Sequence, residues 1–296
     1  MVTKKPMKRK TRILLILLAV LLCLILPGFY NALKVVHYTV NTSNAAQPIR
    51  VALVADLHSC TYGEGQRELL EAIEKEAPDL LLLGGDIFDD QIPNDRAVAF
   101  LKGIQGKYPC YYVTGNHEYW SGKEGFAEKM AILDSYGVIR LSGDVDTIEI
   151  KGMKLNICGV DDPYAWANNG FLIENRDGSY REQVQRVAEL AQNDHFTILL
   201  AHRPEMFSSY SQFGFDLVLS GHAHGGQWRI PGILNGVYAP NQGLFPAYAG
   251  GRYEQNGTVM IVSRGLARES TRVPRFYNRP ELVVVDLIHQ SGDMAQ

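Results

Sequence analysis

The segment LSGHAHGGQWRIPG, residues 219–232, places two histidines, His222 and His224, one residue apart among several glycines. Neutral imidazole is the commonest metal ligand in proteins, and glycines allow a chain to turn tightly where a strand ends. An isolated H-x-H pair is equally compatible with a surface turn that binds nothing. The pair therefore indicates a metal site only if other parts of the chain supply further ligands.

Further candidate ligands follow other apolar runs, each of the kind that forms a buried strand. They are Asp56, His58, Asp86, Asn116, His117 and His202. In open α/β sheets the carboxyl ends of the strands meet at one edge, where ligands bind. Each residue alone has a structural explanation, such as a helix cap for an aspartate or a bond to a buried carbonyl for a histidine. Five strand ends that all carry such groups predict a metal site.

Eight groups are too many for one metal ion and suit two. Oxygen and nitrogen ligands without thiolate favour Mn²⁺, with Fe, Zn or Ni as alternatives, over a structural zinc site. Two divalent ions about 3.5–4 Å apart suit displacement at phosphorus, because one generates hydroxide and both neutralise phosphoryl oxygens. A carboxylate can hold two cations at once, so Asp86 is the predicted bridging ligand.

The elements that must position these groups begin as strands alternating with helices, the pattern of a parallel sheet covered by helices. Strands are expected over 49–58, 78–90 and 108–120, and helices over 64–77, 95–106 and 124–137. Three short strands over 137–143, 145–152 and 153–163 predict sheet built from hairpins. The remaining expected elements are a helix over 179–192 and strands over 196–202, 215–226, 258–265 and 281–287. We therefore expect one mixed α/β domain over 49–288, followed by a short tail over 289–296.

The N-terminal segment predicts a membrane anchor. Six basic residues and no acid precede ILLILLAVLLCLILPGFY, residues 13–30, which is close to the roughly 20 apolar residues that span a bilayer. The run has no polar face and no small-x-small cleavage site follows it, so an uncleaved anchor is favoured over a core helix or a removed signal. We expect a basic cytoplasmic tail over 1–12, a transmembrane anchor over 13–30 and a linker or short strand over 31–48. The protein would then be single-pass in the cell membrane, with its catalytic domain extracytoplasmic.

Charge and cysteine content limit the partners. Without the six N-terminal basic residues, the chain holds 23 basic against 32 acidic residues, a net charge of about −9. Binding along nucleic acid needs a broad basic face, so nucleic acid is not expected as a partner. Cys60, Cys110 and Cys158 are compatible with one disulfide and one free thiol or with three buried thiols, and the second is favoured. The oligomeric state stays open.

Five motifs together resemble the calcineurin-like metallophosphoesterase superfamily. They are D-x-H at 56–58, G-D at 85–86, G-N-H-E at 115–118, a single histidine at 202 and G-H-x-H at 221–224, in the order and spacing of that superfamily. The resemblance implies a four-layer α/β/β/α sandwich of two mixed β-sheets flanked by helices. It implies a first metal held by Asp56, His58, Asp86 and His224, and a second held by Asp86, Asn116, His202 and His222. It also implies that His117 assists the leaving group as a general acid.

Two residues differ from the motifs of other branches of this superfamily, and these differences indicate which branch the chain resembles. Asp89 stands where purple acid phosphatases have a tyrosine, and Asp90 stands where protein Ser/Thr phosphatases have a phosphate-binding arginine. The chain is more similar to a membrane-anchored bacterial group of phosphodiesterase-like proteins, the YkuE/YaeI-like proteins. The similar segments are GVDDP (159–163), LSGHAHGGQ (219–227), GLFPAYAGG (243–251), VSRGL (262–266) and NRPELVVV (278–285). That similarity implies a lipid-linked or envelope-derived phosphoester substrate.

The predicted function is a membrane-anchored, dinuclear metal-dependent phosphoesterase that hydrolyses a phosphodiester or pyrophosphate bond with metal-bound hydroxide. Asp89 and Asp90 make a doubly charged monoester the less favourable substrate. The alternatives are a phosphomonoesterase acting on phosphoprotein or sugar phosphate, and a non-catalytic anchored metal-binding protein, which would be expected to lack a ligand or His117. Arg203 and Arg264 are candidates for binding a phosphate oxygen, or equally for surface ion pairs. The aromatic stretch 236–253 suits a lid or a membrane-facing patch, but packing is the expectation.

Overall fold

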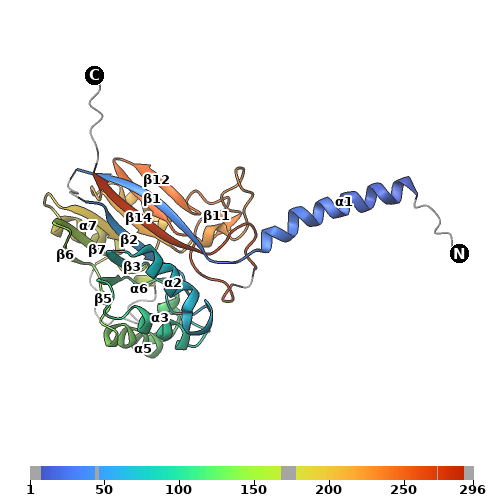
Figure 1. Ribbon diagram of the computed structural model, residues 1–296. Helices are drawn as coiled ribbons and strands as arrows, with labels where there is room; N and C mark the ends of the chain where they lie inside the picture. Colours follow the sequence, from blue (N-terminus) through green and yellow to red (C-terminus); the bar gives the residue numbers. More distant parts are fainter. Residues whose placement is uncertain (1–7, 44–46, 168–177, 272, 290–296) are drawn as a thin grey trace, which may run out of the picture.

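Two six-stranded mixed sheets face each other, and helices cover their outer faces (Figure 1). The computed structural model describes residues 8–43, 47–167, 178–271 and 273–289. The predicted four-layer α/β/β/α sandwich is confirmed, because each sheet packs one face on the other sheet and one face on helices.

The first sheet contains the strands that carry the N-terminal half of the site. Its order is β1 (Lys34–Thr42), β14 (Glu281–His289), β2 (Ile49–Val54), β3 (Leu80–Leu83), β4 (Cys110–Tyr112) and β5 (Ile139–Arg140). The strands β2 to β5 run parallel, whereas β14 is antiparallel to β2 and parallel to β1. Its outer face is covered by α2 (Arg67–Glu76), α3 (Asp95–Ile104) and α5 (Gly122–Ser135).

The second sheet carries the C-terminal half of the site. Its order is β12 (Gly251–Gln255), β13 (Thr258–Val262), β9 (Leu217–Ser220), β8 (Phe196–Leu200), β7 (Met153–Gly159) and β6 (Asp144–Ile150). Parallel pairing joins β13, β9, β8 and β7, and β6–β7 is an antiparallel hairpin. The helices α7 (Tyr180–Leu190) and α8 (Phe207–Tyr210) pack on its outer face.

Alternation along the strands builds both interfaces of each sheet. In β2, Val51 and Leu53 point into the core between the sheets, whereas Ala52 and Val54 point toward the helices. All four side chains are fully buried. A strand buried on both faces reads as a continuous apolar run, which is why the sequence alone identifies it.

Short elements connect the strands near the site. They are η2 (Glu64–Gln66), α4 (Asn116–Trp120), α6 (Tyr164–Ala167), η3 (Pro204–Met206), η4 (His224–Gly226) and the two-stranded hairpin of β10 (Tyr238–Ala239) and β11 (Gly243–Leu244). None of β10, β11 and β12 is predicted from the sequence.

Two expectations change in the structure. Within the segment expected as a linker or short strand, residues 34–42 form the nine-residue strand β1, which pairs along its whole length with β14. The strand β5, expected in the hairpin sheet, instead pairs with β4 in the first sheet. Both pairings add an edge strand to the first sheet. The periodicity of a strand's own sequence does not specify which strand it pairs with. The expectation of three buried thiols is confirmed, since Cys60, Cys110 and Cys158 are buried and free.

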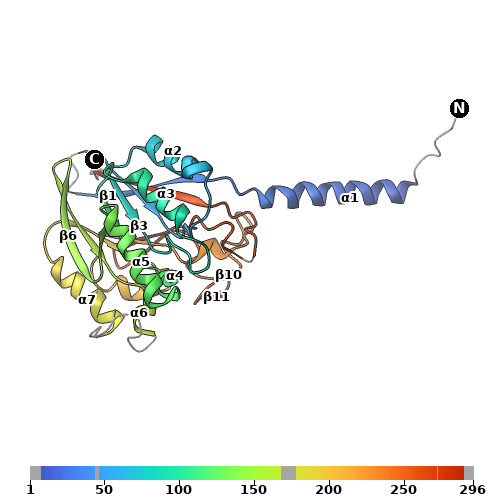
Figure 2. The ribbon, with the colours of Figure 1, turned by 90° about the horizontal axis from the view of Figure 1, so that it is seen from below.

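The helix α1 (Arg9–Ile25) continues into the 3₁₀ turn η1 (Leu26–Phe29) and projects away from the body (Figure 2). Together they form 21 residues, within which an 18-residue stretch has a mean hydropathy of 2.7, long and apolar enough to cross a membrane. Membrane anchors and cleaved signal sequences near the N-terminus share this composition.

Candidate metal centre

The predicted ligands all lie just beyond the carboxyl ends of strands. Asp56 and His58 follow β2, Asp86 follows β3, and Asn116 begins α4 after β4. From the second sheet, His202 follows β8, and His222 and His224 follow β9. Parallel strands bring these ends to one edge, so residues up to 168 positions apart become neighbours.

The ligand atoms form two groups that share one carboxylate. Asp56, His58, Asp86 and His224 place one ligand atom each within 4.8 Å of one another, and so do Asp86, His202 and His222. The Nε2 atom of His202 lies 3.2 Å from Asp86 Oδ2, and that of His58 lies 3.6 Å from the same oxygen. Asp86 is therefore positioned to bridge two cations.

The site also contains buried polar atoms without hydrogen-bond partners. Among the described residues these include Asp86 Oδ2, Asn116 Oδ1 and His202 Nε2. Leaving such atoms unpaired in a protein interior costs free energy, and most are satisfied in folded proteins. Oxygen and imidazole nitrogen atoms left open at one place are the donor set of borderline divalent cations. The residues present thus fit a pair of such ions.

Hydrogen bonds on the far side of the rings orient the imidazoles. His202 Nδ1 donates to the carbonyl oxygen of Gly84 at 2.8 Å, and His58 Nδ1 donates to Asp89 Oδ2 at 3.0 Å. With Nδ1 protonated, each Nε2 presents its lone pair to the cluster. His222 differs, because its Nε2 already contacts Arg203 Nη1 at 2.8 Å and Asn241 Oδ1 at 3.0 Å, which leaves Nδ1 as the ring nitrogen available to a cation.

The backbone at the site is strained. The φ angles of Asp56, His58, Asp86, His222 and His224 are between 46° and 65°, in the left-handed region that side chains with a Cβ rarely adopt. Non-glycine residues persist there only where the surrounding structure holds them, and they cluster at functional sites. The spacing of the ligands in the sequence does not reveal this backbone conformation.

Two glycines allow the backbone to approach the carboxylates closely. A Cβ at Gly115 would lie 2.2 Å from Asp86 Oδ1, and one at Gly221 would lie 2.6 Å from Asp56 Oδ2. The backbone amide of His222 donates to Asp56 Oδ1 at 2.9 Å, and that of His117 donates to Asp86 Oδ1 at 2.8 Å. The glycines therefore open the space in which backbone N–H groups fix the orientation of both carboxylates.

Charge within the cluster shifts the ionisation of its members. Burial opposes the ionisation of Asp56, but the charges of His224 and His202 outweigh it and lower the pKa of Asp56 to about 2. Burial likewise disfavours protonation of His202, yet the neighbouring carboxylate of Asp86 raises its pKa to about 10. The carboxylates thus favour a proton on His202, whereas burial lowers the pKa of His222 and of His224 and keeps these two imidazoles neutral, the form that binds a cation.

Glu118 supports the site from beneath and was not singled out from the sequence, although it closes the G-N-H-E motif. Its fully buried carboxylate accepts N–H groups of Gly115 at 2.8 Å, Asp86 at 3.1 Å and Phe88 at 3.2 Å. Burial and the charge of Asp86 raise its pKa to about 7. Glu118 thereby ties the turn after β3 to the start of α4.

His117 stands beside the two groups and is held by an acid. Its Nδ1 lies 2.5 Å from Asp90 Oδ1, and its ring packs edge-on against His58 with centroids 4.3 Å apart. Asp89 and Asp90 are thus engaged by histidines, whereas the sequence reading treats them as charges facing a phosphate. Their effect on monoester binding is correspondingly reduced.

A groove of about 430 Å³ opens over the cluster. Its lining includes Arg203, which is held by Asp162 through two nitrogens and donates to Asn241 Oδ1 at 2.6 Å. Arg264 does not line the groove, and its guanidinium donates instead to Asn235 Oδ1 at 2.8 Å. The structure therefore brings one of the two predicted arginines to the site.

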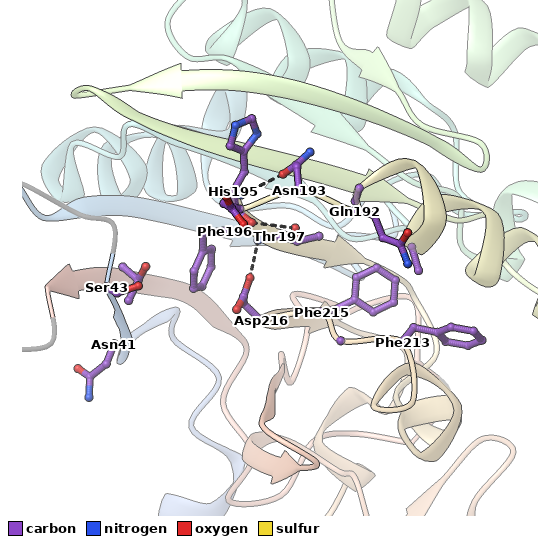
Figure 3. Close-up of a pocket in the computed structure, with 15 residues that line it drawn as sticks. Asn41, Ser43, Gln192, Asn193, His195, Phe196, Thr197, Phe213, Phe215 and Asp216 are labelled. Atoms are coloured by element: carbon purple, nitrogen blue, oxygen red, sulfur yellow. Dashed lines mark hydrogen bonds between the residues drawn. The ribbon is translucent and has the colours of Figure 1, made fainter.

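A second cavity, of about 630 Å³, lies at the opposite edge of the second sheet (Figure 3). It is lined by the beginning of β8 and the residues before β9, where Thr197 N–H donates to Asp216 Oδ2 at 2.7 Å. His195 and Asn193 also line it, and the His195 amide donates to Asn193 Oδ1 at 2.9 Å. None of the three metal-binding groups found among the described residues includes a residue of this cavity.

Comparisons with known proteins agree with this geometry. The sequence model of the family "calcineurin-like phosphoesterase" matches residues 49–226. The chain is 28% identical to the uncharacterized metallophosphoesterase YkuE of Bacillus subtilis over 80% of this chain and 78% of YkuE. It is 26% identical to the uncharacterized metallophosphoesterase YkoQ of the same organism, covering 90% of this chain and 97% of YkoQ.

Other matches cover a smaller share of the related protein. Two uncharacterized metallophosphoesterases of Helicobacter pylori are each 27% identical, and the alignments span 60% and 52% of their lengths. Among solved structures, the NAD nucleotidase NadN of Haemophilus influenzae superposes with a TM-score of 0.55 at 18% identity, over 75% of this chain and 46% of NadN. A 5′-nucleotidase precursor from Thermus thermophilus superposes with a TM-score of 0.50 at 15% identity, over 82% of this chain and 55% of the precursor. These two structures support the fold.

Proposed function

The chain belongs to the calcineurin-like phosphoesterase family of hydrolases, and on this premise we propose that it is a membrane-anchored, dinuclear metal-dependent phosphoesterase that cleaves a phosphodiester or pyrophosphate bond. One observation carries the proposal: Asp86 belongs to both ligand groups, and its Oδ2 is buried without a hydrogen-bond partner among the described residues. A shared carboxylate is what two adjacent cations require.

We assign the ligands of the two cations from the same geometry. Asp56, His58, Asp86 and His224 would hold one cation, and Asp86, Asn116, His202 and His222 would hold the other. When bound, the pair supplies Lewis-acid activation of water and neutralises charge on the phosphoryl oxygens. The absence of thiolate ligands favours Mn²⁺, with Fe, Zn or Ni as alternatives.

The remaining polar groups would handle the proton and orient the substrate. With Nδ1 held by Asp90, His117 can carry a proton on Nε2 and give it to the leaving oxygen as a general acid. Arg203 lines the groove and is fixed by Asp162, so its guanidinium is preorganised to donate to a phosphoryl oxygen.

The groove walls favour an ester with two organic substituents. Trp120, Tyr164, Tyr238 and Val273 line the opening and supply apolar and aromatic surface on which a second substituent can pack. A monoester has no such group, which makes the diester or pyrophosphate the better match. A phosphomonoesterase is the second candidate, supported by the engagement of Asp89 and Asp90 with histidines, which lessens repulsion of a doubly charged phosphate.

The anchor gives the proposed location. The basic residues before α1 would stay in the cytoplasm, so the body would lie on the extracytoplasmic side of the cell membrane as a single-pass protein. There it meets phosphoesters that are carried on lipids or derived from the envelope.

The test uses the full chain in detergent, stripped of metal and reloaded with Mn²⁺, with hydrolysis of bis-p-nitrophenyl phosphate compared with that of p-nitrophenyl phosphate. We expect diester cleavage that requires metal and falls in the His117→Ala variant but not in the matched His195→Ala variant, which alters the cavity at the far edge of the sheet. Faster monoester cleavage would favour the second candidate. No cleavage of either substrate by protein with two bound metals would refute the proposed activity.

A further inference from the structure

Large apolar side chains gather on the surface beside the groove. Six of them, here called the apolar rim, come from the loops between β9 and β12: Trp228, Ile230, Ile233, Tyr238, Leu244 and Phe245. The exposed fractions are 83% for Ile233, 67% for Leu244 and 66% for Phe245. The sequence favoured packing for part of this stretch, but these side chains face solvent. Clustered apolar exposure of this kind marks an interaction surface.

The rim carries little charge, with Arg229 as the one charged residue between Trp228 and Phe245. Residues 230–251 contain no Asp, Glu, Lys or Arg, although the chain beyond residue 30 carries a net charge of about −9. A surface loop in water normally carries polar and charged side chains, because they hydrate well. An uncharged, apolar stretch on an acidic body is the composition suited to the interface of a bilayer, where Trp and Tyr are also enriched.

Backbone contacts join the rim into one unit that reaches the metal centre. Phe245 N–H donates to Val237 O at 2.8 Å, and Val237 N–H donates to Trp228 O at 2.9 Å. In the hairpin of β10 and β11, Asn241 occupies the connecting turn and contacts His222, while Leu244 is exposed on β11. The hairpin therefore has one end at the ligands and its apolar side chains outside.

The same unit is fastened to the body end of α1. The ring of Phe276 packs against Phe29 with centroids 5.1 Å apart and against Trp228 at 5.6 Å. Tyr277 N–H donates to the carbonyl of Gly28 at 2.6 Å, and Arg229 N–H donates to that of Phe276 at 3.0 Å. Both views show β11 on the side of the body from which α1 departs (Figures 1 and 2).

We propose that the apolar rim inserts into the interface of the bilayer that α1 spans, so that the groove opens along the headgroup layer and receives a phosphoester carried on a lipid. The inference rests on the proposed membrane anchor and adds a docking surface and a route of entry. The contacts of Gly28 and Phe29 leave no flexible linker between α1 and the body, so the bilayer lies within reach of the rim. Apolar side chains there exchange water for acyl chains, which favours insertion.

The test measures where the rim lies. The full chain, with Cys23→Ser to remove the exposed native thiol, receives Phe245→Cys, is labelled with an environment-sensitive fluorophore and is reconstituted in phosphatidylethanolamine–phosphatidylglycerol vesicles. Leu190→Cys is the matched control, because Leu190 is an exposed apolar residue on α7, with an exposed fraction of 61%. For the fluorophore at position 245 we expect a blue shift and strong quenching by lipids that carry a shallow spin label. For the fluorophore at position 190 we expect neither effect.

Three results would overturn the inference. Equal, weak quenching at both positions means that the rim stays in water. A blue shift at position 245 without quenching by lipid means that a second copy or another part of the protein covers the rim. A double Leu244→Ser/Phe245→Ser variant adds a functional readout, the ratio of hydrolysis of a vesicle-borne phosphodiester to that of bis-p-nitrophenyl phosphate, which we expect to fall by about an order of magnitude. An unchanged ratio contradicts the route of entry. If the wild-type chain cleaves neither substrate, the proposed activity fails, while the quenching measurement still decides the docking.

Discussion

The contact between His117 and Asp90 makes the sharpest prediction about the reaction. Loss of a general acid lowers kcat by about 10²–10⁴, which raises the barrier by roughly 3–5 kcal/mol, and this is the expected cost of His117→Ala. Asp90 touches the ring at Nδ1, 2.5 Å away, so it acts by orienting His117. In Asp90→Asn the amide oxygen still accepts the hydrogen bond but the negative charge is lost, so the expected loss is smaller, about tenfold.

The assay is a double-mutant cycle on full-length, Mn²⁺-loaded protein. Initial rates with bis-p-nitrophenyl phosphate are measured for wild type, both single variants and the double variant, and the metal content of each protein is determined. Since Asp90 acts through His117, the double variant should be as slow as His117→Ala alone. Asp134→Asn serves as the control. Asp134 is an exposed acid on α5 that pairs with Arg140, and neither residue lines the groove.

Two outcomes would refute this reasoning. If Asp90→Asn slows the His117→Ala protein by the same factor as it slows the wild type, the two residues act independently. If His117→Ala loses one equivalent of metal, His117 is a ligand and not the acid. The second outcome is a real alternative in the structure, because His58, Asp89 and His117 also bring ligand atoms within 4.8 Å of one another.

Three further predictions concern the site and the fold. Gly115→Ala places a Cβ 2.2 Å from Asp86 Oδ1 and 2.6 Å from the Asp86 backbone nitrogen, so both bound metal, measured by atomic emission, and the melting temperature should fall. Leu219→Ala empties a fully buried position between the sheets and should lower the free energy of unfolding by about 2–5 kcal/mol in denaturant titrations; a loss below 1 kcal/mol would contradict tight packing there. Burial raises the pKa of Glu281, opposed by Arg264, so its contribution to stability is full below the ordinary glutamate pKa and is lost as the pH rises through the raised value. Wild type should therefore gain melting temperature relative to Glu281→Gln between pH 7 and pH 4; a constant difference would exclude this shift.

The sequence predicts the parts of the molecule that local chemistry determines. Strands β2 and β9 are buried on both faces and appear as apolar runs, so their ends, with Asp56 and His222 just beyond them, can be located without a structure. The sharing of Asp86 follows from the number and type of ligands. In the structure, Asp86 lies in both groups of neighbouring ligand atoms, and the binding of metal by these groups stays a prediction.

The parts that the sequence does not predict depend on contacts between distant segments. The pairing of β1 with β14 joins residues about 247 positions apart, and no periodicity in either strand specifies its partner. The attachment of Asp90 to His117 depends on the rotation of a turn after β3, and adjacent acids in a sequence do not show which one faces the ring. Exposure of Leu244 is likewise a property of the assembled loops, because an apolar residue in a glycine-rich stretch reads equally well as packed.

Three consecutive residues connect the proposed anchor, the apolar rim and the candidate metal centre. Phe276 packs between Phe29 at the end of the anchor and Trp228 of the rim, and Tyr277 bonds to the turn that follows α1. Asn278 Nδ2 then donates at 2.7 Å to the carbonyl of His224, one of the proposed ligands. A helix joined to a catalytic body by a flexible tether would restrict only the distance of the groove from the bilayer. In a chain anchored through α1, a helix end packed on the segment that supports a proposed ligand would also fix which way the groove faces.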